Sequence, residues 1–214
     1  MAETLENLII RTCTLEEEPI IGEMHHTAFT SSHGKKRAKE NYNQLKEQLA
    51  RGHILVAVLD REIAGFAGYD FAEDNPEHKE MYLEIMLYHA RNPEQKETLL
   101  EHFRERQKEY GGEVVLEYFS NFFTQPDLKI RDADMNLTHL SISPKWRRKG
   151  IGEALTKKRI EIAQKKCSSA IYVHCWEKNG IVQLYKKLGF LPIIRGGPTY
   201  ADGSPMTFMG LLLQ

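Results

Sequence analysis

A short basic and glycine-rich segment is the first feature of this chain that could do chemistry. It reads Arg147-Arg148-Lys149-Gly150-Ile151-Gly152 and follows an apolar stretch that ends at Ser143. Glycine lets backbone amides approach an anion closely, and the first turn of a helix adds unpaired N–H groups and the positive end of its dipole. The segment therefore predicts a phosphate or diphosphate loop, with a solvated basic turn before a helix as the alternative.

Two well-known phosphate loops do not fit this segment. A P-loop needs a lysine and then a serine or threonine after its second glycine, whereas Gly152 is followed by Glu153-Ala154. A dinucleotide fingerprint needs a third glycine and an early place in a βαβ unit, and both are missing.

Histidines and cysteines give weaker signals. His25 and His26 have no carboxylate or cysteine at metal-ligand spacing, so we predict no metal site. Cys175 is a lone cysteine in a strand-like run, which is more typical of a small buried apolar residue than of a nucleophile. The three cysteines are odd in number and lack CxxC spacing, which favours a reducing, intracellular compartment.

Length and charge limit the remaining function classes. The 214 residues suit one well-buried domain, and we expect a single domain over residues 1–214. The net charge of -1 provides no overall field for nucleic acid or an anionic membrane. The N-terminus does not resemble a signal peptide, and no run reaches the roughly 20 apolar residues of a membrane span. We therefore expect a cytoplasmic protein, with the nucleus as an alternative, and no nucleic-acid or membrane partner.

Apolar periodicity and turn residues predict alternating helices and strands. The N-terminal part is expected to form a strand at Leu8–Ile10, helices at Pro19–Phe29 and Lys39–Ala50 with a loop at Ser31–Arg37 between them, and a hairpin of His53–Leu59 and Glu62–Tyr69. The C-terminal part is expected to form a strand at Asn136–Ser143, helix Gly150–Lys166, strand Ala170–Trp176, helix Asn179–Lys187 and strands Leu191–Ile194 and Met206–Leu213.

Residues of about 71–135 interrupt this alternation. Asn92-Pro93 is a typical helix start and Gly111-Gly112 a typical stop, and apolar and aromatic residues recur at helical spacing between and after them. We expect a helical insertion that either covers a substrate site or forms a homodimer contact.

Two motifs together resemble a known family. Leu140-Ser141-Ile142-Ser143-Pro144, followed by Arg147-x-x-Gly150-x-Gly152 and Leu155, is similar to the central motif of the GNAT acetyltransferase superfamily. About thirty residues later, Leu184-Tyr185-Lys186-Lys187-Leu188-Gly189-Phe190 resembles its second motif. The resemblance implies an α+β fold with α/β/α layers. Its mixed, strongly twisted sheet would have about six to seven strands, a splay between the fourth and fifth, and helices on both faces.

The resemblance also implies acetyl-CoA as co-substrate, bound in the splay. The pantetheine arm would pair with the backbone of Leu140, Ser141 and Ile142. The pyrophosphate would lie on the amides of Arg148, Lys149, Gly150, Ile151 and Gly152, with Arg147 at the head of the loop. Asn179 is a further candidate, although the family's asparagine stands seven rather than six residues before the tyrosine, and one residue turns a helix by about 100°.

Acetylation of an amine needs a neutral amine, a stabilised oxyanion and a proton for the departing thiolate. The resemblance assigns the proton donor to Tyr185, whose alternative is a buried structural tyrosine. At the family's base positions stand Asn136 and Thr138, neither of which is basic, and strand alternation predicts that His139 faces the other way. His174 and Asp134 remain candidates for the base, each with a structural alternative.

In similar proteins the acceptor contacts the first two helices and the loop between the last two strands, here about 19–50 and 196–203. Tyr200 and Asp202 could form an aromatic wall and an amine anchor, or an ordinary turn. We expect a small-molecule amine substrate that attacks acetyl-CoA directly in a ternary complex. A protein N-terminal or lysine acetyltransferase and a catalytically silent acyl-CoA-binding module are the alternatives.

Overall fold

The computed structural model describes residues 7–74, 132–168, 170–176, 180–199 and 205–213. The chain forms two compact units, one of Met1–Phe71 with Ala133–Gln214 and one of Ala72–Asp132. In the second unit, a 3-10 helix spans η2 (Ala72–Asp74), and the Glu73 N–H donates to the Asp132 carbonyl over 3.1 Å. The helices expected within the insertion lie outside the described residues. One domain with an insertion at 71–135 therefore stays a prediction.

The first unit alternates strands and helices in an order close to the expected one. Its described elements are β1 (Ile9–Thr12), η1 (Leu15–Glu17), α1 (Glu18–Ala50), β2 (Ile54–Leu59), β3 (Glu62–Phe71), β4 (Met135–Ile142), η3 (Pro144–Trp146), α5 (Ile151–Lys165), β5 (Ala170–Trp176), α6 (Ile181–Lys187), β6 (Leu191–Thr199) and β7 (Pro205–Leu212). Within these residues no helix is long and apolar enough to cross a membrane.

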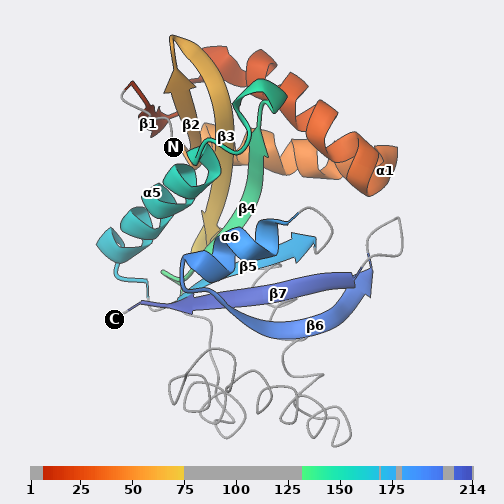
Figure 1. Cartoon of the computed structure of the whole chain (residues 1–214), viewed down its shortest axis with the longest axis vertical. Helices are drawn as coiled ribbons and strands as arrows, with labels where there is room; N and C mark the ends of the chain where they lie inside the picture. The colour runs from red at the N-terminus through yellow and green to blue at the C-terminus, as the bar shows by residue number, and fades with distance from the viewer. Residues whose placement is uncertain (1–6, 75–131, 169, 177–179, 200–204, 214) are drawn as a thin grey trace, which may run out of the picture. The chain divides into compact units, whose positions relative to one another are not determined.

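The described strands form one seven-stranded sheet in the order β1-β2-β3-β4-β5-β7-β6. Neighbouring strands are antiparallel except for β4 and β5, which are parallel. Figure 1 shows that β5, β7 and β6 run across the direction of β2, β3 and β4, so the sheet is strongly twisted. The predicted α+β fold with a mixed sheet is confirmed.

The turn of the β2–β3 hairpin lies at the predicted position between Leu59 and Glu62. Asp60 and Arg61 both have positive φ, 51° and 66°. Two left-handed residues in a two-residue loop make a type I′ turn, whose twist matches that of the flanking strands. The antiparallel pairing of Leu59 with Glu62 follows directly from this turn.

The predicted loop at Ser31–Arg37 is wrong, because α1 is continuous from Glu18 to Ala50. Its ribbon changes direction along its length (Figure 1). Gly34 costs a helix only about 1 kcal/mol, which is too little to end a helix that is stabilised on both sides. The two predicted helices are thus the two arms of one bent helix.

The predicted end of the strand at Ile194 is also wrong, since β6 continues to Thr199, which pairs with Pro205 of β7. The loop expected at 196–203 therefore begins later, although the register between β6 and β7 is irregular between Arg195 and Thr199. Pro198 is tolerated because β6 is an edge strand, where a missing N–H need not break a ladder.

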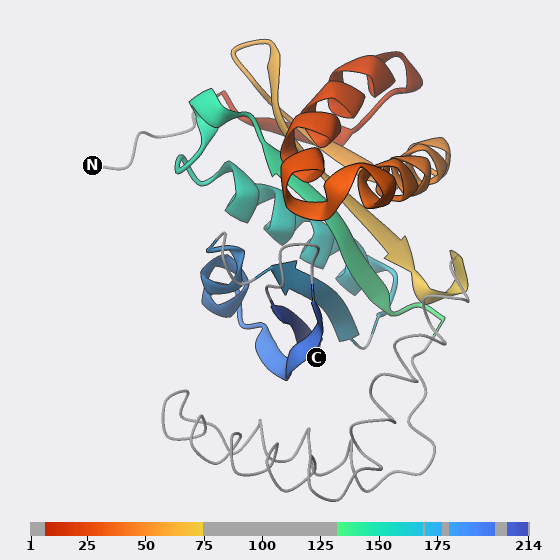
Figure 2. The same cartoon turned by 90° about the vertical axis from the view of Figure 1, so that its right-hand side faces the viewer.

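The two faces of the sheet bury separate apolar clusters. Ala67, Tyr69 and Phe71 of β3 belong to the cluster that includes α5 and α6, whereas Phe66 belongs to the cluster with α1. Figure 2 shows α1 and α5 on opposite sides of β2, β3 and β4. This alternation fixes which side chains of β4 face each helix.

Candidate functional site

The parallel pair of β4 and β5 separates after a short contact. Met135, Asn136 and Leu137 pair with residues 171–173, and the pairing stops there. β4 continues to pair with β3 up to Ile142, while β5 continues with β7 up to Trp176. The β4 edge from Thr138 to Ile142 is therefore not paired with β5. This is the splay between the fourth and fifth strands that the family resemblance implied.

The open edge presents backbone groups from alternate residues. The Ser143 N–H donates to the Ala64 carbonyl over 2.9 Å, so Ser143 and, two residues earlier, Ser141 direct their amide groups toward β3. Leu140 and Ile142 consequently direct theirs toward the splay. Of the three predicted pantetheine contacts, Leu140 and Ile142 have the required orientation, whereas Ser141 offers its side chain rather than its backbone.

The basic loop has the backbone shape of an anion-binding turn. Arg147 is extended, Arg148 has a φ of 65° and Gly150 a φ of 86°, and α5 begins at Ile151. The first intrahelical bond runs from the Ala154 N–H to the Gly150 carbonyl over 3.0 Å. The preceding N–H groups of the first turn therefore point out of the helix end, and left-handed residues beside them curve the chain into a concave nest.

The two loop glycines have different roles. Gly150 is left-handed, which favours glycine. A Cβ on Gly152 would lie 3.6 Å from Leu184, 3.8 Å from Leu140 and 3.9 Å from Ile142, all side-chain contacts of ordinary length. A side chain at Gly152 would therefore lie against other protein side chains, and the place of its amide in the anion-binding loop stays a prediction.

Cations surround the loop, and most of them already have partners. The Arg147 Nε donates to the Ile142 carbonyl over 3.1 Å, which holds the guanidinium beside the open edge of β4. Lys149 lies over the Trp146 ring at 5.3 Å from its centroid. Lys187 pairs with Glu153 at 2.6 Å, which links α6 to the first turn of α5. Arg147 is thus a loop cation that lies beside the open edge of β4.

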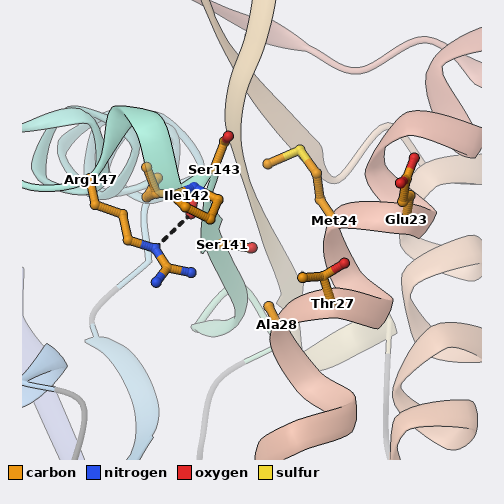
Figure 3. Close-up of a pocket in the computed structure, with 9 residues that line it drawn as sticks. Glu23, Met24, Thr27, Ala28, Ser141, Ile142, Ser143 and Arg147 are labelled. Atoms are coloured by element: carbon orange, nitrogen blue, oxygen red, sulfur yellow. Dashed lines mark hydrogen bonds between the residues drawn. The ribbon is translucent and has the colours of Figure 1, made fainter.

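A pocket of about 130 Å³ lies between α1 and the end of β4. Figure 3 shows Glu23, Met24 and Thr27 of α1 opposite Ser141 of β4, with the Arg147 guanidinium at one end. The pocket is lined by apolar and polar side chains: Glu23, Met24, Thr27, Ala28, Ser141, Ile142, Ser143, Pro144 and Arg147. It joins the open strand edge to the basic loop, as an extended ligand with an anionic part would require.

Tyr185 is held by the way α6 ends. Gly189, with a φ of 88°, donates to the Lys186 carbonyl, and the Phe190 N–H donates to the Tyr185 carbonyl, both over 3.0 Å. These two bonds form a Schellman motif, which explains the Leu-Gly-Phe sequence. The motif brings the Phe190 ring to 5.1 Å from the Tyr185 ring, between centroids.

Tyr185 is only 2% exposed. Burial raises the pKa of its phenol above the usual value, although the Arg159 guanidinium acts to lower this pKa and Cys175 acts to raise it. The phenol is therefore protonated at neutral pH and can donate a proton, but its role as the general acid stays a prediction.

The candidate bases lie in different places. Asp134 is buried and accepts from the Ala170 N–H over 3.0 Å, so its carboxylate helps to start β5. His174 is half-buried on β5, between Val173 and Cys175, which face the core with Tyr185. Strand alternation puts His174 on the other face of β5. The structure does not bring Tyr185 and His174 together on one face.

The predicted orientation of His139 is wrong. Between the pairs Ala67–Leu140 and Tyr69–Leu137, Gly68 alone on β3 opposes both Thr138 and His139 on β4, which is a β-bulge. The Thr138 hydroxyl donates to Gln48 of α1 over 3.0 Å, and the His139 ring lies 5.2 Å from that of His25, also on α1. The extra residue cancels the alternation, so both side chains face α1.

Three further candidates cannot be placed. Asn179, Tyr200 and Asp202 lie outside the described residues and stay predictions. Arg159, which is wholly buried on α5, was not among the residues predicted from the sequence. The spacing of Arg159 in the sequence does indicate a buried position, because it lies four residues after Leu155 and four before Ala163 on the buried stripe of the helix.

Comparison with known proteins agrees with this geometry. The model of the acetyltransferase (GNAT) domain matches residues 93–213, which is more than half of the chain. We find no significant match among curated protein sequences.

Solved structures show the same fold. The ribosomal-protein-alanine N-acetyltransferase from Brucella melitensis is 14% identical with a TM-score of 0.58, covering 96% of this chain and 99% of that one. An N-acetyltransferase from Staphylococcus aureus is 15% identical with a TM-score of 0.60, covering 97% and 99%. The Salmonella typhimurium protein yncA, solved with its cofactor acetyl-CoA, is 15% identical with a TM-score of 0.58, covering 97% and 95%.

Proposed function

Because the chain belongs to the GNAT acetyltransferase family, we propose that it transfers the acetyl group of acetyl-CoA to a primary amine. The observation that carries this proposal is the splay. The parallel strands β4 and β5 separate after Leu137 and Val173, and the opened edge of β4 leads to the amino end of α5. An extended thioester with a diphosphate fits such an arrangement.

The open edge and the loop would hold different parts of acetyl-CoA. The backbone groups of Leu140 and Ile142 are oriented to pair with the amides of the pantetheine arm, as in the addition of a strand to a sheet edge. The N–H groups at the start of α5 and the Arg147 guanidinium would hold the diphosphate. Acetyl-CoA supplies the activated acetyl group.

Tyr185 is proposed as the general acid. Its phenol is buried and protonated, and a positioned acid of this kind accelerates a reaction by about 100- to 10,000-fold. We expect Tyr185→Phe to lower kcat by at least about 100-fold while the KM for acetyl-CoA changes little. The Phe190→Leu variant, which removes the neighbouring ring but keeps the phenol, is the matched control. Unchanged turnover of Tyr185→Phe at every pH would remove Tyr185 from the mechanism.

His174 is proposed as the base that accepts a proton from the amine, directly or through water. Its place on the other face of β5 keeps it away from the acid, so the two groups would not neutralise each other. His174→Gln should lower the rate at neutral pH and have less effect at high pH, where the amine is already deprotonated. An unaltered pH profile would mean that the amine needs no protein base.

We propose a small-molecule amine as acceptor. The test is release of CoA thiol from acetyl-CoA with polyamines, arylalkylamines, amino acids and basic peptides in parallel. A preference for peptides would assign the chain to protein acetylation, which the names of two fold neighbours suggest: the Brucella enzyme and the NatC complex solved with Gag peptide and CoA. CoA binding without thiol release from any acceptor would instead indicate a silent acyl-CoA-binding module.

A further inference from the structure

A chain of polar side chains leads from β3 through α1 to β4. Asp70 of β3 is 1% exposed, and Gln48 of α1 is 0% exposed. The Gln48 side-chain amide donates to an Asp70 carboxylate oxygen over 2.6 Å, and the Thr138 hydroxyl of β4 donates to the Gln48 amide oxygen over 3.0 Å. Two fully buried groups thus hold one half-buried hydroxyl.

The direction of each hydrogen bond in this chain follows from the carboxylate at its end. A carboxylate accepts hydrogen bonds, and donors surround Asp70: Gln44 donates to it over 3.3 Å, and the Arg51 guanidinium lies 3.7 Å away. The nitrogen of the Gln48 amide therefore faces Asp70, which turns the amide oxygen toward β4. That oxygen takes the one proton of the Thr138 hydroxyl, so Thr138 offers a ligand the lone pairs of its oxygen.

The neighbouring strand leaves room for this hydroxyl. A Cβ on Gly68 of β3 would lie 2.5 Å from the Thr138 hydroxyl oxygen and 2.6 Å from the Gln48 amide oxygen. Any side chain at this position would displace both groups. The bulge that sets two β4 residues opposite Gly68 also turns Thr138 toward α1. The position of the hydroxyl is therefore fixed by three elements: β3, β4 and α1.

Thr138 is the first residue of β4 beyond its pairing with β5. Leu137 and Val173 are the last residues that pair, and both belong to the apolar cluster on the α5 side of the sheet. The next residues, Thr138 and His174, therefore stand at corresponding positions on the two separating strands and on the α1 side. Tyr185 belongs to the cluster on the α5 side. The proposed acid thus lies on one side of the splay, and a hydroxyl and an imidazole lie on the other.

We propose that Thr138 binds the acceptor amine through its hydroxyl oxygen, which accepts a hydrogen bond from an N–H group of the substrate. Gln48 and Asp70 are positioning residues that keep this oxygen in the accepting orientation. The inference rests on the proposed function. A neutral primary amine has two N–H groups and one lone pair. With one N–H on Thr138, the lone pair is left for the thioester in the splay and the second N–H for His174, the proposed base.

A purely structural role for the same hydrogen bonds makes a different prediction. Bonds that only tie α1 to the sheet would change the stability of the protein and leave the kinetic constants of the folded enzyme as they are. Bonds that orient a substrate-binding hydroxyl change kcat/KM for the amine. The test therefore measures kinetic constants for the amine and for acetyl-CoA separately.

The experiment uses the full chain and measures release of CoA thiol at saturating acetyl-CoA, with spermidine, phenylethylamine, glycine and a lysine-rich peptide as amine probes. Thr138→Val removes the hydroxyl and keeps the size of the side chain, whereas Thr138→Ser keeps the hydroxyl. Gln48→Met removes the amide that orients the hydroxyl. Thr12→Val makes the same hydroxyl-to-methyl change in β1, at the edge of the sheet, and is the matched control.

We expect Thr138→Val to lower kcat/KM for the amine about 3- to 10-fold, because one hydrogen bond to the substrate is lost, while the KM for acetyl-CoA stays nearly constant. The decrease should be the same at every pH, since a threonine hydroxyl does not titrate, and this separates Thr138 from a base. Thr138→Ser and Thr12→Val should stay within about twofold of wild type.

The positioning role of Gln48 is read from a double variant. Gln48→Met should lower kcat/KM for the amine in wild type and change it little in the Thr138→Val background, because the amide acts through that hydroxyl. Should Gln48→Met fail to fold, the comparison of Thr138→Val with Thr138→Ser carries the test.

Four outcomes would overturn the proposal while wild type is active. The first is an unaltered kcat/KM in Thr138→Val, and the second is a Thr138→Ser variant as slow as Thr138→Val. The third is an equal decrease in Thr12→Val, and the fourth is a change confined to the KM for acetyl-CoA. Additive losses in the double variant would remove the positioning role of Gln48. No thiol release from wild type with any probe would overturn the proposed function, and this inference with it.

Discussion

The two glycines of the basic loop allow a sharp test, because the same substitution should have opposite effects at positions two residues apart. Alanine at Gly150 would have to adopt a φ near 86°. The left-handed conformation costs an L-residue roughly 1–2 kcal/mol. Alanine at Gly152 meets only side chains at 3.6–3.9 Å and lies in the first turn of α5, where it gains up to about 1 kcal/mol of helix propensity.

These energies translate into measurable changes. In a chain of this size, 1 kcal/mol shifts Tm by about 2–4 °C. We expect Gly152→Ala to raise Tm by up to about 4 °C and to leave the Kd for CoA within about twofold. In Gly150→Ala the backbone strain has two possible effects. If the loop keeps its shape, Tm should fall by about 2–8 °C. If the loop relaxes, CoA binding should weaken by about 5- to 30-fold.

The assay combines thermal unfolding followed by circular dichroism with calorimetric titration of CoA. Gln164→Ala, on the exposed last turn of α5, is the control for alanine substitution in the same helix. An unchanged Tm and an unchanged Kd in Gly150→Ala would mean that the left-handed conformation at this position is not required. The reasoning about Gly152 is refuted if Gly152→Ala weakens CoA binding more than tenfold, because the missing Cβ would then face the ligand rather than the protein.

Three further predictions concern stability and reactivity. Hydrogen bonds from Arg11 lower the pKa of Glu17 from 4.5 to about 2, so the stability that this carboxylate contributes is present above about pH 4.5 and is lost as pH falls through 2. Glu17→Gln should thus lower the free energy of unfolding by about 0.5–1 kcal/mol at pH 6 and by almost nothing at pH 2, as measured by urea unfolding. A difference between wild type and variant that is the same at both pH values would contradict this prediction. Burial raises the pKa of the Cys13 thiol to about 12, whereas Cys167 is exposed. Iodoacetamide at pH 8 should therefore modify Cys167 first, and fast alkylation of the Cys167→Ser variant would contradict this prediction. A Cβ on Gly68 would lie 2.5 Å from the Thr138 hydroxyl oxygen, so Gly68→Ala should lower the unfolding free energy by about 1–3 kcal/mol, and unaltered urea unfolding would disprove the close approach.

Local signals were enough to predict the elements that carry the two motifs. The hairpin turn at Asp60-Arg61, the strand β5 and the helices α5 and α6 follow from turn residues and apolar periodicity, which act over a few residues. The splay came from the family resemblance rather than from periodicity. The separation of β4 from β5 depends on which strands pair, and pairing partners lie far apart in the sequence.

The errors arose where tertiary contacts override local preference. The continuity of α1 through Gly34 is one case, because a single glycine is a weak helix breaker when the chain on both sides is helical. The continuation of β6 to Thr199 is another, since it depends on the pairing of Arg195 and Thr199 with the distant strand β7. The direction of the Gly152 Cβ could not be predicted either, because it depends on Leu184, which is distant in sequence.

The β-bulge at Thr138 and His139 connects these separate features of the site. One extra residue on β4 opposite Gly68 increases the local twist, and β4 leaves β5 directly after Leu137. The carbonyls of Gly68 and His139, which lie at this bulge, accept hydrogen bonds from Arg159. The point at which β4 leaves β5 and the site of the buried Arg159 guanidinium therefore coincide with a single irregularity in strand pairing. Because a bulge is defined by the pairing of two strands, the sequence of β4 alone predicts neither the separation of β4 from β5 nor the position of the carbonyls that bind Arg159.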